Sequence, residues 1–309
     1  MTLLSQRRCF GAVTLCLLVS GGGLLAVQDR DARLEVQPSV LALSPGGVVL
    51  LTVRSAEPLA AIEGEVLGQA IRFWPTEHSR AWSGLATAGL DAQPGTYELG
   101  VQARAPDGNL VRSQATVRVQ ARQFETRRLQ VQSAFVDPPA SEHERIGREA
   151  KLLAHALSDS RPGRVWRGPF VAPVSGQSTS SYGRLTILNG QPQGRHLGAD
   201  FRAAVGVPVR APNASRVVLA ADLYFTGNTI VVDHGDGLVS LFAHLSRIAV
   251  EAGALAARGD LLGEAGATGR VTGPHLHWAV RLENRSVDPE ALLRALANID
   301  EQVEIRSGR

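Results

Sequence analysis

The chain has 309 residues, enough for two domains, and 44% of them are hydrophobic. Its formal net charge is only +3, and neither a basic cluster nor a high aromatic content marks a nucleic-acid surface, so we expect no nucleic-acid partner. Both cysteines, Cys9 and Cys16, lie near the N-terminus, so the rest of the chain contains no internal disulfide and depends on its cores.

The first 30 residues have the pattern of an export signal. Arg7 and Arg8 precede an apolar stretch over residues 10–27, and the charged sequence QDRDAR follows at once. The stretch also approaches the ~17 residues that a membrane span requires. We therefore predict that residues 1–30 form a signal peptide or an uncleaved membrane anchor. Either would place the rest of the protein in the periplasm or cell envelope.

Residues 34–122 have the pattern of an antiparallel β-sandwich. Short runs rich in valine and leucine alternate with turn sequences such as SPGG, QPG and PDGN. Tyr97 fits a tyrosine corner, in which the hydroxyl binds nearby backbone at the start of a strand. A segment of about 90 residues can bury its own core, so we predict an immunoglobulin-like domain. The sequence leaves three roles of this domain open: binding of glycan, binding of protein, and holding the rest of the chain away from a membrane.

Residues 123–170 are predicted to be a linker that contains one amphipathic helix. Ser141 and Glu144 have the spacing of a capping box, and the apolar residues after them recur on one helical face. This pattern predicts a helix over residues 141–158. The apolar residues are Ile146, Ala150, Leu153 and Leu157.

Residues 171–295 are predicted to form a second β-rich domain, followed by a C-terminal tail over residues 296–309. Runs such as SRVVLAAD, NTIVVDH and LVSLFAH are separated by glycine, proline, asparagine and aspartate, which is typical of antiparallel strands joined by tight turns. The protein is therefore expected to be mostly β, with a sandwich, a short helical connector and an antiparallel sheet domain.

Four histidines and one aspartate in this second domain have the spacing of a mononuclear metal site. His196 and Asp200 lie in RHLGADF, His244 in LFAHLS, and His275 and His277 in TGPHLHW. On a strand, His275 and His277 present both imidazoles on one face, because successive side chains alternate. Imidazole and carboxylate suit zinc, and three protein ligands leave a fourth position open for water. An open position is the mark of a catalytic zinc rather than a structural one.

The local sequence also separates these residues from the other histidines. Gly198, between the first two motif residues, favours a loop that leads into a strand over a helix. His234, in VVDHGDG, is interpreted as a hairpin residue because turn-forming residues surround it. Three further histidines have no partner at ligand spacing and are interpreted as ordinary surface or hydrogen-bonded residues: His78, His143 and His155.

The three motifs, in this order, resemble the lysostaphin-type zinc metallo-endopeptidases, which cleave peptide cross-bridges of bacterial peptidoglycan. The resemblance extends over about Val171 to Leu293 and includes every polar position of the family motif. It implies one zinc ion held by His196, Asp200 and His277 at the floor of an open cleft. It further implies that His275 is the general base and His244 a second catalytic histidine.

Such a site hydrolyses a peptide bond without a covalent intermediate. Zinc lowers the pKa of water from ~16 toward ~7, and an imidazole with a pKa of ~6.5 can accept the proton and return it to the departing amine. We assign that role to His275. His244 is placed, as a hypothesis, beside the oxygen that gains negative charge.

The sequence thus predicts an exported zinc endopeptidase that acts on cross-links or stem peptides of peptidoglycan. The alternative is a non-hydrolytic protein that binds the cell wall or activates a separate amidase, and the complete ligand set favours the enzyme. The sequence leaves two kinds of cleaved bond open: bonds in glycine bridges, and bonds between D-alanine and a diamino acid. Loops around Thr179 to Gly194 are expected to make that choice. The oligomeric state is left open.

Overall fold

The computed structural model describes residues 34–40, 42–76, 80–130 and 136–299. The predicted export segment, residues 1–30, and residues 300–309 of the predicted tail lie outside this part of the chain. Among the helices that are described, none combines the length and the apolarity that a membrane span requires. The described chain is mostly β, as predicted.

The first β-rich part is an eight-stranded sheet with the hydrogen-bonded order β1-β3-β6-β5-β4-β7-β8-β2. One end of β5 pairs with β4 and the other end with β6, so the sheet folds over onto a shared core. The strands are β1 (Glu35–Pro38), β2 (Ala42–Leu43), β3 (Val48–Arg54), β4 (Ala61–Val66), β5 (Gln69–Pro75), β6 (Ala81–Thr87), β7 (Gly95–Arg104) and β8 (Leu110–Val119).

The core of this sheet follows the alternation of its strands. Leu51 from β3 and Leu99 from β7 are fully buried in it. The hydroxyl of Tyr97 donates a hydrogen bond of 2.8 Å to the carbonyl oxygen of Gln93, which is the contact predicted for a tyrosine corner. A β-rich domain therefore occupies the predicted range, and its immunoglobulin-like class stays a prediction.

The connector forms a short strand, β9 (Thr126–Leu129), then the 3-10 turn η2 (Ala140–Glu142) and helix α1 (His143–Ser158). The predicted helix exists, but its capping box does not form. Ser141 lies in the 3-10 turn, and the N-cap position is taken by Glu142, which makes no side-chain cap hydrogen bond. Strand β9 was not predicted.

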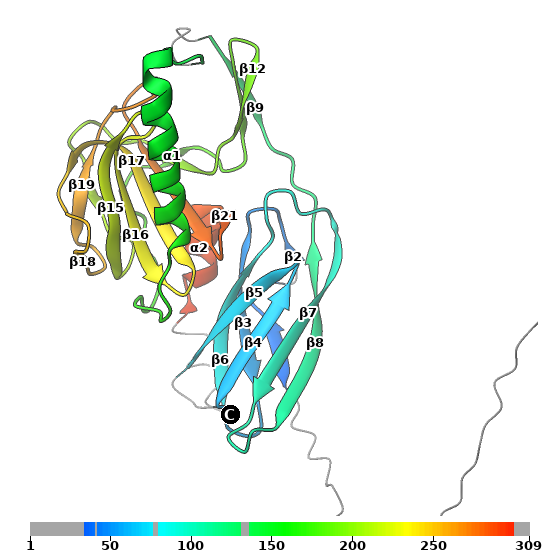
Figure 1. Cartoon of the computed structure of the whole chain (residues 1–309). Coiled ribbons are helices and arrows are strands. Elements are labelled where there is room, and N and C mark those ends of the chain that lie inside the picture. The colour runs from blue at the N-terminus through cyan, green and yellow to red at the C-terminus, as the bar shows by residue number, and fades with distance from the viewer. Residues whose placement is uncertain (1–33, 41, 77–79, 131–135, 300–309) are drawn as a thin grey trace, which may run out of the picture. The chain divides into compact units, whose positions relative to one another are not determined.

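Helix α1 covers one face of the second sheet, as Figure 1 shows. Ala156 is buried against Leu219, Val231 and Leu241, which belong to three neighbouring strands of that sheet. The predicted apolar face of the helix thus finds its partner in the sheet rather than in the sandwich.

The second sheet has ten strands, with the main order β10-β13-β20-β17-β16-β15-β18 and with β14, β19 and β21 attached at its side. Its strands are β10 (Ser178–Ser180), β13 (Gly198–Phe201), β14 (Pro208–Arg210), β15 (Ser215–Leu223), β16 (Gly227–Gly235), β17 (Leu238–Ile248), β18 (Leu255–Ala256), β19 (Leu261–Ala265), β20 (Leu276–Leu282) and β21 (Arg285–Val287). All of its strand pairs are antiparallel, as the turn-rich sequence predicts.

The core of this domain extends beyond the predicted limits of 171 and 295. Upstream, Trp166 and Phe170 are buried in it. Downstream, helix α2 (Pro289–Leu296) contributes Leu296, and Ile299 follows it into the core. The side chain of Asp288 caps α2 by accepting a hydrogen bond from the backbone of Glu290, which starts the helix against the sheet.

A third, three-stranded sheet has the order β12-β11-β9. β11 (Leu185–Leu188) and β12 (Gln191–Arg195) form an antiparallel hairpin, and β9 from the connector pairs with β11 in parallel. The connector is therefore part of the domain that carries the predicted metal site.

Candidate metal centre

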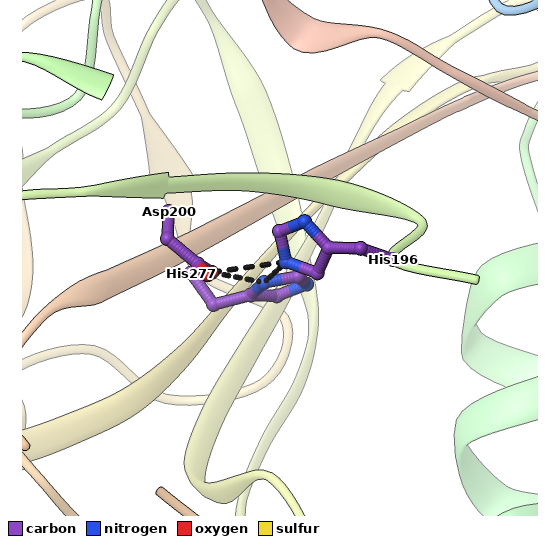
Figure 2. A group of neighbouring side chains, drawn as sticks. All are labelled: His196, Asp200 and His277. Atoms are coloured by element: carbon purple, nitrogen blue, oxygen red, sulfur yellow. Dashed lines mark hydrogen bonds and ion pairs between the residues drawn. The ribbon is translucent and has the colours of Figure 1, made fainter. Parts of the chain in front are cut away.

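Three of the five predicted site residues meet at one point. His196 lies between β12 and β13, Asp200 lies in β13, and His277 lies in β20. Since β13 and β20 are antiparallel neighbours and Asp200 pairs with His277, the two side chains share one face of the sheet. The chain from β12 turns back over them and brings in His196, as Figure 2 shows.

Gly198 permits the close approach of β13 to β20. A Cβ atom at this position would lie 2.5 Å from the carbonyl oxygen of Trp278 and 2.8 Å from Cε1 of His277. No real side chain tolerates such contacts without displacing its neighbours. The predicted loop into a strand is therefore correct, and the glycine serves packing rather than a turn.

The polar atoms of the three side chains form a small triangle. Nε2 of His196 and Nδ1 of His277 each lie 3.0 Å from Oδ1 of Asp200, and the two nitrogens lie 3.0 Å from each other (Figure 2). A tetrahedral ion with bonds of about 2.0–2.2 Å holds its ligand atoms roughly 3.4 Å apart. The triangle therefore fits a small divalent ion with an expansion of a few tenths of an ångström.

The surroundings of Asp200 favour the ionised form that a metal ligand requires. Burial alone would raise its pKa, but the adjoining imidazoles of His196 and His277 outweigh burial and hold the pKa below the usual range of a carboxyl group. Nδ1 of His196 lies 3.2 Å from the carbonyl oxygen of Ser181, which directs Nε2 toward the triangle.

The other two predicted residues adjoin the triangle without joining it. Nε2 of His275 lies 3.6 Å from Oδ1 of Asp200, and the rings of His275 and His244 lie 4.9 Å apart between centroids. Nδ1 of His275 lies 2.8 Å from the carbonyl oxygen of Gly273, and Nδ1 of His244 lies 3.0 Å from that of Thr268.

These hydrogen bonds fix the tautomers of both imidazoles. A carbonyl oxygen only accepts, so Nδ1 carries the proton in His275 and in His244, and the neutral ring keeps its lone pair on Nε2. In both residues, the ring nitrogen with the free lone pair is therefore Nε2. For His244, burial and then the neighbouring His277 and His275 lower the pKa to about 3, so its neutral form prevails at pH 7.

The backbone at His244 is in an uncommon conformation. Its φ angle is +64°, in the left-handed region, which is uncommon for residues other than glycine. The residue lies where the pairing of β16 with β17 changes register, and its amide donates to the carbonyl oxygen of Thr226. A bulge of this kind redirects one side chain out of the regular alternation of a strand, here toward the metal triangle.

The five residues line a cleft of about 330 Å³. One wall is the three-stranded sheet β12-β11-β9, and the segment predicted to select the substrate, 179–194, supplies much of it. The lining residues are Arg127, Leu129, Arg184, Thr186, Leu188, Gln193, Gly194, Arg195, His196, Asp200, Phe225, Thr226, His244, Arg270, Val271, Thr272, His275 and His277. No residue of α1 is among them, whereas β9 contributes two.

The remaining histidines lie away from this cleft. His234 is fully buried at the end of β16, where Nδ1 contacts the carbonyl oxygen of Ala214 and Nε2 contacts the hydroxyl of Ser240. His143 and His155 are exposed on α1. His78 lies outside the described residues.

The cleft also contains four arginines that lie outside the sequence motifs of the site: Arg127, Arg184, Arg195 and Arg270. They come from separate segments, and none has a fixed spacing to the metal motif. Only the folded chain brings them together.

Comparison with known proteins adds to this geometry. The sequence pattern of peptidase family M23 matches residues 194–289. The chain is 40% identical over 93 residues to the peptidoglycan DD-endopeptidase ShyB of Vibrio cholerae, and 36% identical over 94 residues to the DD-carboxypeptidase/endopeptidase Mpg of Neisseria meningitidis. Each match covers 30% of this chain and 22% of the relative. The chain therefore spans about a fifth of the length of these curated relatives.

A solved structure covers much more of the chain. The crystal structure of an M23 peptidase from Pseudomonas aeruginosa has a TM-score of 0.62 and 30% sequence identity, and the match covers 82% of this chain and 95% of that one. The similarity thus includes both β-rich parts and the connector. Together with the matched family pattern and the site geometry, it shows that this chain belongs to peptidase family M23.

Proposed function

We propose that the protein is a zinc-dependent endopeptidase that hydrolyses peptide bonds in bacterial peptidoglycan. The observation that carries this proposal is the triangle of His196, Asp200 and His277 beside two further imidazoles in an open cleft. ShyB, whose match includes the region of the site, is a peptidoglycan DD-endopeptidase, which supports the same substrate class. Export to the periplasm or cell envelope agrees with that substrate and is part of the proposal.

The three residues of the triangle would hold one zinc ion, each through a single atom. When bound, zinc supplies a Lewis acid that lowers the pKa of water and polarises the carbonyl group of the substrate. The hydrogen bond between Nδ1 of His196 and the Ser181 carbonyl holds the ring in the orientation that the ligand set needs.

His275 acts as the general base in this proposal. Its Nε2 carries the lone pair and lies 3.6 Å from the carboxylate of Asp200, so it faces the place where water attacks. The proton that it takes up can then be returned to the departing amine. The bond from Nδ1 to Gly273 keeps the ring aimed at the cleft during both transfers.

His244 is proposed as the second catalytic histidine. A donor role beside the developing negative charge requires a proton on Nε2, because Nδ1 is committed to Thr268. The low pKa of the neutral ring opposes that state until negative charge develops nearby. We therefore assign donation by His244 to the transition state alone, where it favours catalysis over substrate binding.

Digestion of purified sacculi tests this function. The zinc-loaded full chain is expected to release soluble peptides, and a chelator or Asp200→Ala is expected to stop the release. Release that persists in Asp200→Ala would disprove the metal-dependent mechanism. Absence of release by the wild-type protein, combined with stimulation of an added amidase, would favour the activator alternative. Mass spectrometry of the released peptides identifies the cleaved bond.

A further inference from the structure

Positive charge is concentrated in the cleft. Four arginines line it, whereas Asp200 is the only acidic residue among the described residues that do so. The formal net charge of the whole chain is only +3. A cleft lined by charge of one sign attracts ligands of the opposite sign.

Two of these arginines are held by the protein itself. The guanidinium of Arg195 donates to the carbonyl oxygen of Gly183 and stacks on the ring of Phe124. The guanidinium of Arg270 lies over Phe225 and contacts the side-chain oxygen of Gln193 at 3.4 Å. Both have defined structural contacts, so they are less available to a ligand.

Arg184 is placed differently. It is only 11% exposed, and its nearest carboxylate oxygen is Oδ2 of Asp200, at 3.8 Å from Nη2, which is beyond hydrogen-bonding distance. Its buried Nε has no hydrogen-bond partner among the described residues. A buried guanidinium with an unsatisfied donor is costly unless a ligand pairs with it.

Arg127 increases the local positive charge. It lies on β9 directly opposite Thr186 of β11, is exposed, and has no carboxylate within 4 Å among the described residues. Burial lowers the pKa of Arg184, and the charge of Arg127 lowers it further, against the opposite effects of Asp200 and, more weakly, Glu125. The two guanidinium groups thus repel each other, and an anion between them would relieve that repulsion.

We propose that Arg184 and Arg127 form a carboxylate-binding subsite beside the metal triangle, so that the preferred substrate has a free carboxylate on a residue adjoining the scissile bond. This proposal rests on the proposed function and makes it more specific. A guanidinium matches a carboxylate in geometry and in charge. Peptide bridges made of neutral residues offer no such group and are expected to be poor substrates.

The position of Arg184 limits where that carboxylate can be. Its guanidinium lies 3.8 Å from an oxygen of a proposed metal ligand, and one residue of extended chain spans roughly 3.3–3.6 Å. The carboxylate therefore belongs to a residue next to the cleaved bond and not to a distant part of the peptide.

Matched peptides test the subsite in the zinc-loaded full chain. The two members of the first pair of cross-linked stem peptides differ only at the residue that supplies the departing amine. Next to that amine, one member carries a free carboxylate and the other carries a carboxamide. A second pair places the same two groups on the residue before the scissile bond. The wild-type protein is expected to prefer the carboxylate member of one pair by about tenfold to hundredfold in kcat/KM, the range of a charge-assisted hydrogen bond.

Arg127→Gln is the decisive variant, because Arg127 is exposed on a strand and its loss should not disturb folding. We expect its preference for the carboxylate peptide to fall toward one, and Arg184→Lys to keep more of the preference than Arg184→Gln. Arg128→Gln is the matched control, since Arg128 is the next residue of β9 and does not line the cleft. If Arg184 merely orients Asp200, its variants will lose zinc or slow both peptides equally.

Binding separates this proposal from the proposed function. Calorimetry with the chelator-treated protein should show tighter binding of the carboxylate peptide than of the carboxamide peptide, and Arg127→Gln should remove the difference. The subsite proposal is overturned if kcat/KM and affinity are equal within both peptide pairs. It is also overturned if Arg127→Gln keeps the full preference for the carboxylate peptide. If no peptide and no sacculus is hydrolysed while the affinity difference persists, the proposed function fails and the subsite stands.

Discussion

At the scale of single residues, His275 and His277 are two positions apart and point to the same side, yet they differ in which nitrogen faces the site. His277 presents Nδ1 to the triangle, whereas His275 binds a backbone carbonyl through Nδ1 and presents Nε2. The proposed ligand and the proposed base thus differ in ring orientation, which the sequence motif alone does not reveal.

Substitutions should separate these two roles. We expect His277→Ala and Asp200→Ala to lose both zinc and hydrolysis, because each removes one of three ligands. His275→Ala should keep stoichiometric zinc and lose roughly 10²- to 10⁴-fold in kcat, the usual contribution of a general base. Metal analysis and rates on the same samples provide the measurement, with His155→Ala on the exposed face of α1 as the control. Hydrolysis by His275→Ala at the wild-type rate would refute the base assignment.

His234 is expected to make folding stability depend on pH. Burial, only partly offset by the hydrogen bond to Ala214, lowers its pKa to about 4 from the 6.5 of an unperturbed histidine. The unfolded chain therefore binds the proton first. The contribution of the neutral His234 side chain to the free energy of unfolding is fully present above pH 6.5 and is lost as the pH falls through about 4. Within this range the free energy of unfolding changes with a slope that approaches about 1.4 kcal/mol per pH unit.

Urea unfolding of the chelator-treated protein between pH 7.5 and 4.5 measures this effect. At pH 7.5 the His234→Gln variant should be less stable than the wild type, since glutamine fits the buried site less well than histidine. On acidification, however, its free energy of unfolding should fall less steeply than that of the wild type. Parallel curves for the two proteins would show that His234 does not titrate in this range.

At the scale of elements, the geometry of the proposed metal site depends on how closely β13 approaches β20. Gly198→Ala would force a methyl group against the backbone of β20 and the ring of His277. We expect it to lower the free energy of unfolding by about 1–3 kcal/mol and to weaken zinc binding. Thermal unfolding and zinc competition against a chelator measure both effects.

Gly100→Ala is the matched control, because a Cβ atom there would have no neighbour within 4 Å. It should leave zinc affinity unchanged. Equal zinc affinity in Gly198→Ala and wild type would show that the strand spacing does not set the ligand geometry.

Strand β9 shows the limit of sequence reasoning at this scale. The sequence TRRL in the connector has no alternation or turn signal that distinguishes it from a loop. It becomes a strand because the edge of β11 supplies hydrogen-bond partners. Helix α1, whose apolar periodicity is clear, was predicted from the sequence, although its exact start was not.

At the scale of the whole molecule, one strand serves two cores. Leu51 of β3 is buried in the core of the sandwich, while Leu50 belongs to the core that contains Trp166. The ring of Trp74 from β5 also lies 5.3 Å from that of Trp166, edge to face. The two β-rich parts are therefore expected to unfold together.

Metal removal tests this coupling. Because the proposed zinc site forms only in the folded chain, a chelator should lower the Tm of the entire transition, by an amount equivalent to about 4 kcal/mol where free zinc exceeds Kd a thousandfold. Asp200→Ala should unfold at the same temperature with and without chelator. Two separate transitions in calorimetry, of which only one responds to chelator, would contradict a shared folding unit.

The sequence by itself predicted the mostly β fold, the helix of the connector and five residues that line one cleft. These features rest on local periodicity and on motif spacing, which require no knowledge of distant segments. Only the tertiary structure decided the tautomers of His275 and His244, the strand β9 and the arginines of the cleft. Each of these depends on hydrogen bonds or charges from segments far apart in the chain, and such partners meet only once the sheets have formed.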